Sequence, residues 1–177
     1  LVPWCHIFGL LFSFLVPLRG GGVLDLRAGI SPRALLENAA AGDLDLVVAV
    51  PAIYRAFVRQ LEGGTVGGGP IRCRFVSSGA PLPAGLRRRF TELTGQPISD
   101  FYGSTEAGGV AFRHDDGPWR VEPHVQVRVE GDGQLWARSP SVSTVPAGEF
   151  LATGDLVRLS GDRFELLGRA DDVVKIG

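Results

Sequence analysis

The sequence lacks several residue types that enzymes often use. Its 177 residues include no methionine, two cysteines and three histidines, and Lys175 is the only lysine. Because Leu1 is not a methionine, we expect the chain to be a fragment with an upstream part removed. Chemistry that needs an amine must use Lys175 or a group from elsewhere.

The scarce cysteines and histidines show no metal-site pattern. Cys5 and Cys73 are far apart and form no Cys-x-x-Cys pair, which favours reduced, buried thiols in a cytoplasmic protein. His6, His114 and His124 are too scattered to indicate a zinc site. The sequence also lacks a Gly-x-Ser-x-Gly elbow, a Gly-x-Gly-x-x-Gly loop and a His-Glu-x-x-His motif. The common hydrolase, dinucleotide and zinc-enzyme interpretations are therefore excluded.

Neither the charge balance nor the apolar runs indicate binding to nucleic acid or to a membrane. Lys plus Arg is 18 and Asp plus Glu is 19, so the sequence has no basic surplus for nucleic acid or an anionic membrane. The apolar run 7–16 lacks a basic leader and is too short to span a bilayer. It predicts a buried helix that ends near Pro17, in a protein with no membrane span.

The first two thirds of the sequence alternate between strand and helix patterns. Ser31-Pro32 is typical of a helix start, and the predicted helices are 33–41, 52–61 and 83–93. The predicted strands are 23–26, 44–50, 72–78 and 98–102. This alternation indicates an α/β fold with a mostly parallel sheet and flanking helices, whose ligand site lies beyond the carboxyl ends of the strands. The triplet Arg87-Arg88-Arg89 is interpreted as a solvated helix face, and the glycine-rich stretch 63–69 as a surface loop.

The last third has only short strand patterns, separated by Gly-Asp, Asp-Gly and Pro-Ala-Gly turns. These predicted strands are 121–129, 134–139, 149–153, 156–159 and 163–167. They favour a small antiparallel β-barrel or sandwich. The predicted organisation is therefore an α/β subdomain over 1–117, a β-barrel subdomain over 118–170, and a hinge over 171–177.

The segment 100–109 combines an aromatic ring, hydroxyls, a carboxylate and glycine backbone. Tyr102 offers a flat face for a base, Ser104 and Thr105 offer hydroxyl donors, and Glu106 suits a hard cation such as Mg²⁺. Exposed backbone N–H groups after a strand can hold an anion. The alternative is a polar turn with a capping Ser or Thr before a short helix, and this segment alone does not decide between the two.

Three motifs resemble those of the adenylate-forming (AMP-binding) enzymes, a superfamily that includes the acyl-CoA synthetases. They are Tyr-Gly-Ser-Thr-Glu at 102–106, Thr-Gly-Asp-Leu at 153–156 and Gly-Arg-Ala-Asp-Asp-Val-Val-Lys at 168–175. Segments 3–9 and 78–82 support the match, which runs essentially from end to end.

The resemblance implies an ATP-dependent acid–thiol ligase. A carboxylate attacks the α-phosphate of ATP to give an acyl-adenylate and pyrophosphate, and a thiol then takes the acyl group. The implied cofactors are ATP, Mg²⁺ and coenzyme A, or the phosphopantetheine of a carrier protein. The apolar segment 8–14 indicates a fatty or aromatic carboxylic acid as the substrate, and with it a role in fatty acid metabolism.

The resemblance also implies roles for residues of this chain. Tyr102 would stack on adenine, Thr105 would bind the α-phosphate and Glu106 the Mg²⁺, so Thr105 and Glu106 are the predicted catalytic residues. Asp155 would accept the ribose hydroxyls, and Arg169 would reach the same sugar. The rest of the predicted nucleotide rim is Gly79, Ala80, Pro81, Asp100, Phe101, Gly103 and Ser104.

Other roles concern the acyl side and the hinge. His6, Gly103, Gly108 and Gly109 would line the acyl substrate, and Asp171 and Lys175 would belong to the hinge. Taken alone, Asp155 could be a turn aspartate, Arg169 could pair with a surface acid and His6 could be a core histidine.

Two family features are missing from the sequence: the phosphate loop ending in lysine, and the C-terminal domain with the catalytic lysine. The chain is therefore expected to be a fragment of the large N-terminal domain, inactive alone and prone to self-association through uncovered apolar surface. The competing hypothesis is a non-catalytic nucleotide-binding or interaction module that has lost the phosphate loop.

Overall fold

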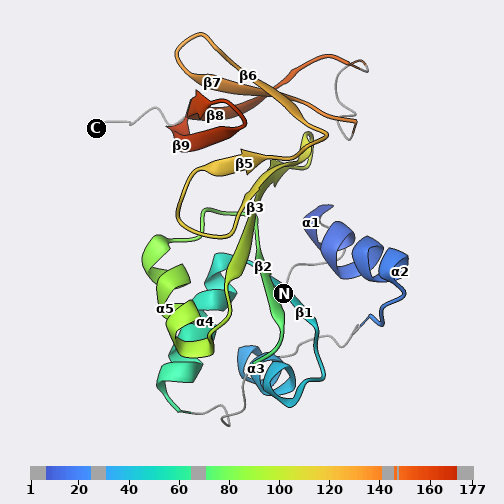
Figure 1. Ribbon diagram of the computed structural model, residues 1–177, viewed down its shortest axis with the longest axis vertical. Coiled ribbons are helices and arrows are strands. Elements are labelled where there is room, and N and C mark those ends of the chain that lie inside the picture. The colour runs from blue at the N-terminus through green and yellow to red at the C-terminus, as the bar shows by residue number, and fades with distance from the viewer. Residues whose placement is uncertain (1–6, 25–30, 65–70, 141–145, 147, 171–177) are drawn as a thin grey trace, which may run out of the picture. The chain divides into compact units, whose positions relative to one another are not determined.

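A computed structural model describes residues 7–24, 31–64, 71–140, 146 and 148–170, and the chain divides into two compact units, Leu1–Asp100 and Phe101–Gly177. This division falls earlier than the predicted boundary after residue 117. The reason is that β4 (Gly108–Arg113) pairs antiparallel with β5 (Trp119–Val121), which places residues 108–113 in the second unit. All described helices belong to the first unit, whereas the described elements of the second unit are strands (Figure 1).

The first unit contains a parallel sheet, as predicted. Its strands are β1 (Leu46–Ala49), β2 (Arg74–Ser77) and the first part of β3 (Ile98–Ser104). Val47 lies opposite Phe75, and Phe75 lies opposite Ile98. Helices α3 (Pro32–Ala41), α4 (Pro51–Glu62) and α5 (Ala84–Thr94) alternate with these strands in sequence. The α/β class is therefore confirmed.

The start of α3 follows from its sequence. The Ser31 hydroxyl accepts a hydrogen bond of 3.1 Å from the Ala34 backbone N–H, and Pro32 occupies the first turn, where a missing N–H has no cost. Gly42 ends the helix with a φ of 84°, a left-handed conformation that suits glycine. These local signals explain why this helix was predictable almost to the residue.

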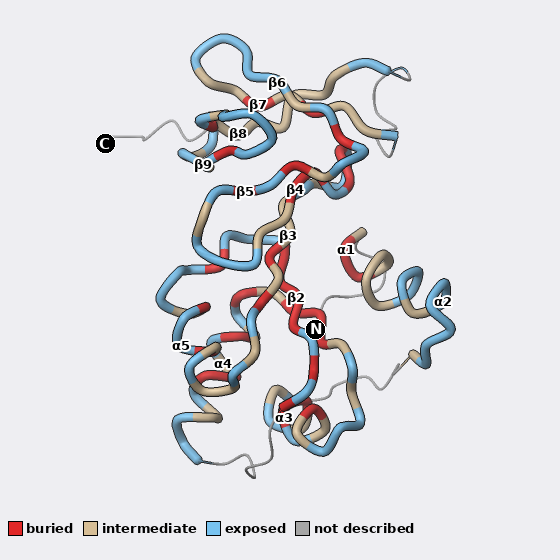
Figure 2. The backbone as a smooth tube through the Cα atoms, viewed as in Figure 1, coloured by how far each residue is buried: buried red, intermediate tan, exposed pale blue. Residues whose placement is uncertain are grey.

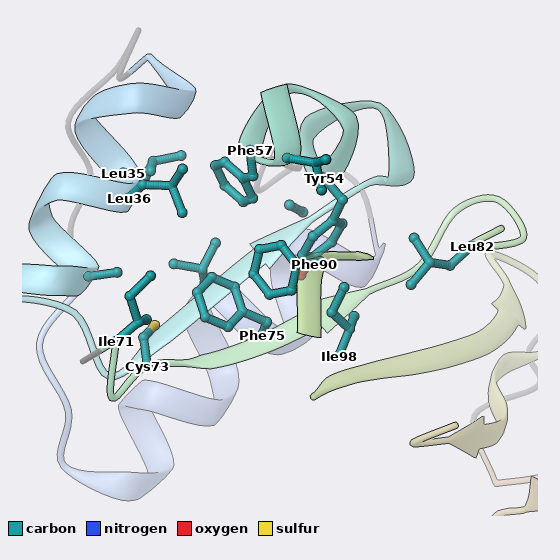
Figure 3. Packing of buried hydrophobic residues seen from close by; sticks show 14 residues of the cluster. Leu35, Leu36, Tyr54, Phe57, Ile71, Cys73, Phe75, Leu82, Phe90 and Ile98 are labelled. Atoms are coloured by element: carbon teal, nitrogen blue, oxygen red, sulfur yellow. The ribbon is translucent and has the colours of Figure 1, made fainter. Parts of the chain in front are cut away.

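The core of the first unit lies between the sheet and its helices. Tyr54 and Phe57 of α4 meet Phe75 of β2 and Phe90 of α5, mostly edge to face, with ring centroids 4.8 to 6.4 Å apart (Figure 3). All four rings are fully buried or nearly so. The Tyr54 hydroxyl donates to the Val76 carbonyl over 2.9 Å, so its buried oxygen has a partner. Such aromatic packing fixes the helices on the sheet.

The predicted helix over 7–16 is longer than expected. It consists of α1 (Ile7–Leu10), a π-helical turn η1 (Leu11–Leu15) and α2 (Val16–Gly20), and so continues past Pro17. A proline in a regular α-helix would clash with the carbonyl four residues earlier, and a wider π-turn just before it relieves that constraint. Phe8 is buried, but Leu18 is 63% exposed, so the expectation of a buried helix holds only at its start.

The second unit contains an antiparallel sheet whose strands pair in the order β4-β5-β9-β8-β7-β6. The strands not yet introduced are β6 (Gln126–Glu130), β7 (Gln134–Arg138), β8 (Leu151–Ser160) and β9 (Arg163–Arg169). Its core includes Val110, Leu135 and Phe164. The buried stretches of its strands are red in Figure 2. These pairings do not show closure into a barrel, which remains a prediction.

Several predicted strands have different limits in the structure. The ranges 149–153 and 156–159 form one strand, β8, because Gly154 takes a φ of 78° without ending the pairing. The range 121–129 is split between β5 and β6 by a turn closed by Val125 donating to the Glu122 carbonyl. Residues 23 and 24 form no strand, and residues 25–30 lie outside the described part. None of the described helices is both long and apolar enough to cross a membrane.

Candidate nucleotide site

The motif 100–109 forms the end of β3, a turn and the start of β4. Residues Thr105–Ala107 make the turn, so the polar turn of the alternative is present, but a strand and not a short helix follows it. The Ser104 hydroxyl accepts from the Ala107 N–H over 3.1 Å, and the Ser139 hydroxyl donates to the Ala107 carbonyl over 3.2 Å. Ser104 therefore caps a backbone N–H as expected, but it does so in a hairpin turn.

Gly103 is required by the close approach of the two hairpin strands. A Cβ atom at this position would lie 2.0 Å from the Gly108 carbonyl oxygen, which no side chain permits. A Cβ at Gly109 would meet nothing within 4 Å. Gly109 therefore borders open space, as an acyl site would need, whereas Gly103 has a structural reason of its own. The acyl-side role of Gly103, Gly108 and Gly109 remains a prediction.

Tyr102 joins the core of the second unit to the predicted ribose residue. Its ring lies 5.7 Å from Trp119 and 5.4 Å from Phe164, centroid to centroid. Its hydroxyl donates to Asp155 Oδ2 over 2.5 Å. Burial, and then this hydrogen bond, raise the pKa of the Tyr102 phenol well above its usual value. Tyr102 is thus held at both ends of its side chain.

Asp155 and Arg169 stand opposite each other on β8 and β9. Arg169 Nη1 lies 3.5 Å from Asp155 Oδ1, with side chains 48% and 13% exposed respectively. The Asp155 N–H donates to the Thr153 hydroxyl oxygen over 3.3 Å. A Cβ at Gly154 would lie 3.0 Å from Arg169 Nη2, so the glycine leaves room for the guanidinium. The motif Thr-Gly-Asp therefore builds a half-buried carboxylate with a cation beside it.

Thr105 and Glu106 are exposed in the hairpin turn. The pKa of Glu106 is lowered by its own backbone N–H and by the Ser104 hydroxyl, so the carboxylate stays ionised. Among the described residues, no group of three or more His, Cys, Asp or Glu side chains could hold a metal ion. Mg²⁺ commonly binds one or two carboxylates together with substrate phosphates, and an exposed, ionised Glu106 fits that mode.

The first unit supplies the other predicted rim residues. Gly79, Ala80 and Pro81 are exposed just after β2, and Gly79 has a φ of 86°, which glycine tolerates. Asp100 is completely buried, and its Oδ2 accepts from Arg87 Nη2 over 3.0 Å. Its side chain is therefore engaged inside the first unit.

The interpretation of the arginine triplet as a solvated face is wrong for its first member. Arg87 is 4% exposed, and it donates to the Ile98 carbonyl over 2.7 Å as well as to Asp100. Arg87 precedes Phe90 by three residues, so both lie on the buried face of α5. That spacing is the sequence signal that could have revealed it. Arg88 and Arg89 are exposed, as predicted.

Three predicted residues cannot be placed. His6, Asp171 and Lys175 lie outside the described residues. Their acyl-side and hinge roles remain predictions. Phe101 is half-buried, with its ring 6.2 Å from that of Phe112.

The second unit thus brings together an aromatic ring, a carboxylate and a guanidinium from three separated motifs. A family model described as AMP-binding enzyme matches residues 1–144. The chain belongs to the AMP-binding enzyme family, the adenylate-forming enzymes.

Curated relatives include 4-coumarate–CoA ligase of Rhodobacter capsulatus, 33% identical over 180 residues, covering 100% of this chain and 42% of the relative. Another is 3-hydroxybenzoate–CoA ligase of Aromatoleum sp., 28% identical over 194 residues, covering 93% of this chain and 37% of the relative. The chain thus spans about two fifths of the length of these relatives.

Solved structures show the same fold. An anthranilate CoA ligase, AuaEII, superposes with a TM-score of 0.81 at 22% identity over 98% of this chain and 39% of that one. Coronafacic acid ligase from Pectobacterium brasiliense gives a TM-score of 0.79 at 23% identity over 97% and 39%. The α/β architecture is therefore shared with adenylate-forming enzymes.

Proposed function

We propose that this chain is part of an AMP-forming acid–thiol ligase that activates a carboxylic acid as an acyl-adenylate and transfers it to coenzyme A. The observation that carries the proposal is the cluster of Tyr102, Asp155 and Arg169. Residues from β3, β8 and β9 meet there through contacts of 2.5 and 3.5 Å. A half-buried carboxylate accepts two hydroxyls well, and a ring beside it suits a base.

The other predicted residues complete the nucleotide site in this proposal. The Thr105 hydroxyl donates to the α-phosphate from the exposed turn, and Glu106 holds Mg²⁺ together with the phosphates. Mg²⁺ supplies neutralisation of the charge that develops during adenylyl transfer. For Gly79, Ala80, Pro81 and Asp100 of the first unit, a role beside the adenine is proposed from the family resemblance alone.

The proposed substrate is an aromatic acid. The curated relatives are named for 4-coumarate and 3-hydroxybenzoate, and a structural neighbour is named for anthranilate. These names favour an aromatic over a fatty acyl group. Coenzyme A is favoured over a carrier-protein phosphopantetheine because each of those names specifies CoA. A cytoplasmic location and self-association belong to the same proposal.

The test is ATP–pyrophosphate exchange with 4-coumarate, 3-hydroxybenzoate, anthranilate and a long-chain fatty acid. It is run on the 177-residue chain and on the longest protein encoded by its reading frame. We expect exchange by the longer protein with an aromatic acid and none by the 177 residues alone. Equal exchange by both proteins would contradict the proposal that the 177 residues form only part of the ligase.

The competing function is a nucleotide-binding module without catalysis. It shares the same cluster, so binding alone does not separate the two. Formation of an acyl-CoA by the longer protein supports the ligase. AMP binding by that protein with no exchange for any acid supports the module.

A further inference from the structure

The Asp155 carboxylate is contacted on both oxygens by groups of very different rigidity. The Tyr102 hydroxyl donates to Oδ2 over 2.5 Å, and Arg169 Nη1 lies 3.5 Å from Oδ1. The Arg169 side chain is 48% exposed and long, so it has several rotamers to lose. The Tyr102 contact is the shorter and the better placed of the two.

The position of the Tyr102 hydroxyl is determined by the core. The ring packs against Trp119 and Phe164, both of which are at most 5% exposed. A tyrosine has only two side-chain torsions, and here both are restricted by these rings. The hydroxyl is thus a fixed donor, and the flexible partner in the hydrogen bond is the Asp155 carboxylate.

We propose that Tyr102 is a positioning residue for Asp155, in addition to any stacking by its ring. This inference rests on the proposed function, in which Asp155 binds the ribose diol. An ionised carboxylate has about four lone-pair positions. The Tyr102 hydroxyl uses one and Arg169 faces another, which leaves one on each oxygen for the two vicinal hydroxyls. The hydroxyl holds the Asp155 side chain in one rotamer, so that both remaining positions point outward together.

Replacing Tyr102 by phenylalanine separates the hydroxyl from the ring. The Tyr102→Phe variant keeps the contacts with Trp119 and Phe164 but leaves Asp155 without its fixed donor. An Asp155 side chain that samples several rotamers binds a diol less well, because it must be ordered on binding. The loss concerns only ligands that carry the ribose hydroxyls.

The first measurement compares the affinities of AMP and 2′,3′-dideoxy-AMP for the 177-residue chain by NMR titration. We expect Tyr102→Phe to reduce the preference for AMP over the dideoxy compound by about fivefold, the size of one hydrogen bond, with unchanged affinity for the dideoxy compound. An equal loss for both ligands would overturn the inference, because the hydroxyl would then affect binding independently of the ribose diol. A gain in AMP affinity would show that the hydroxyl competes with the ribose.

The second measurement needs no ligand. Three-bond couplings across χ1 of Asp155 report whether its side chain holds one rotamer or several. We expect one rotamer in the wild type and averaging in Tyr102→Phe. Equal order in both proteins would overturn the inference whatever the first measurement gives. Loss of Asp155 order in the variant, together with no AMP binding by the longest protein encoded by the reading frame, would instead contradict the proposed function alone.

Tyr54→Phe is the matched control. It also removes a buried tyrosine hydroxyl, one that donates to the Val76 carbonyl in the first unit. We expect it to leave both the AMP preference and the Asp155 couplings as in the wild type. A change equal to that of Tyr102→Phe would contradict the inference, because removal of any buried hydroxyl would then produce the effect.

Discussion

Arg87 Nη2 lies 3.0 Å from Asp100 Oδ2 inside the first unit, with side chains only 5% and 1% exposed. Arg87 Nη1 also donates to the Ile98 carbonyl, so one guanidinium binds two groups of β3. Two charges taken out of water gain little net stability, but removal of one partner is costly. This pair ties α5 to the strand that leads into the Tyr102 motif.

The first prediction concerns this pair. Arg87→Met should destabilise the chain by about 3 to 5 kcal/mol, because Asp100 stays buried without its guanidinium partner. The double variant Arg87→Met with Asp100→Leu should recover most of that loss, since two apolar side chains then face each other. Urea unfolding followed by far-UV circular dichroism gives these values.

The exposed neighbour Arg88 provides the control for that prediction. Arg88→Met should change stability by less than about 0.5 kcal/mol, as surface substitutions do. A similar cost at both arginines would mean that helix propensity, rather than the buried pair, explains the effect. A double variant that is no more stable than Arg87→Met would contradict the argument about the uncompensated charge.

The sequence predicts those elements whose signals are local. Ser31-Pro32 defines the start of α3, and the strand and helix alternation gives the parallel sheet. It does not predict the burial of Arg87, because three adjacent arginines look alike until the packing of α5 chooses one face. It also misses the π-turn before Pro17, whose cause is a backbone clash, and the pairing that continues through Gly154.

The candidate site also has features that the sequence predicts and features that depend on packing. The three motifs indicate which residues of the second unit belong together, and the structure does bring Tyr102, Asp155 and Arg169 into contact. The sequence does not predict that Tyr102 and Asp155 hydrogen-bond directly, since a separation of 53 residues carries no distance information. Nor does it predict that Gly103 is needed by the backbone of Gly108.

The second prediction concerns that close approach. Gly103→Ala should destabilise the second unit by about 3 kcal/mol or more, because the new Cβ meets the Gly108 carbonyl oxygen at 2.0 Å and the hairpin must open. Gly109→Ala is the matched control, since its Cβ has open space and should cost less than about 1 kcal/mol. Thermal unfolding followed by tryptophan fluorescence measures both. Equal melting temperatures for the two variants would be the contrary result.

The third prediction concerns the ionisation of Tyr102. Burial, and then the hydrogen bond to Asp155, raise the pKa of its phenol above 10.0. The folded state therefore keeps the proton that the unfolded state loses. The resulting stability is fully present below about pH 10 and decreases as the pH rises toward the folded-state pKa. Absorbance at 295 nm should show no tyrosinate near pH 10 in the folded chain, because burial also raises the pKa of Tyr54.

The variant Asp155→Asn tests the cause of that shift. Loss of the carboxylate charge should lower the Tyr102 pKa toward its usual value, so that one tyrosine titrates at lower pH than in the wild type. Glu165→Gln removes another carboxylate, the one that pairs with Arg158 on the exposed surface of β8 and β9. It should leave the titration unchanged. A curve for Asp155→Asn that superposes on the wild-type curve would assign the shift to burial alone.

The last prediction concerns Glu106 in the longer ligase. The Glu106 N–H, and then the Ser104 hydroxyl, stabilise the ionised carboxylate and lower its pKa, so Glu106 is charged throughout the neutral range. If it binds Mg²⁺ with the phosphates, its contribution is largest where charge develops, in the transition state. Glu106→Gln keeps the shape but removes the charge. We expect kcat to fall by at least about tenfold with little change in the KM for the acid. We also expect the Mg²⁺ concentration for half-maximal rate to rise.

The control is Glu122→Gln, at a half-buried position in the turn between β5 and β6. It should leave kcat and the Mg²⁺ concentration for half-maximal rate unchanged. A Glu106→Gln enzyme with a wild-type Mg²⁺ dependence would show that the carboxylate serves the hairpin turn and not the metal.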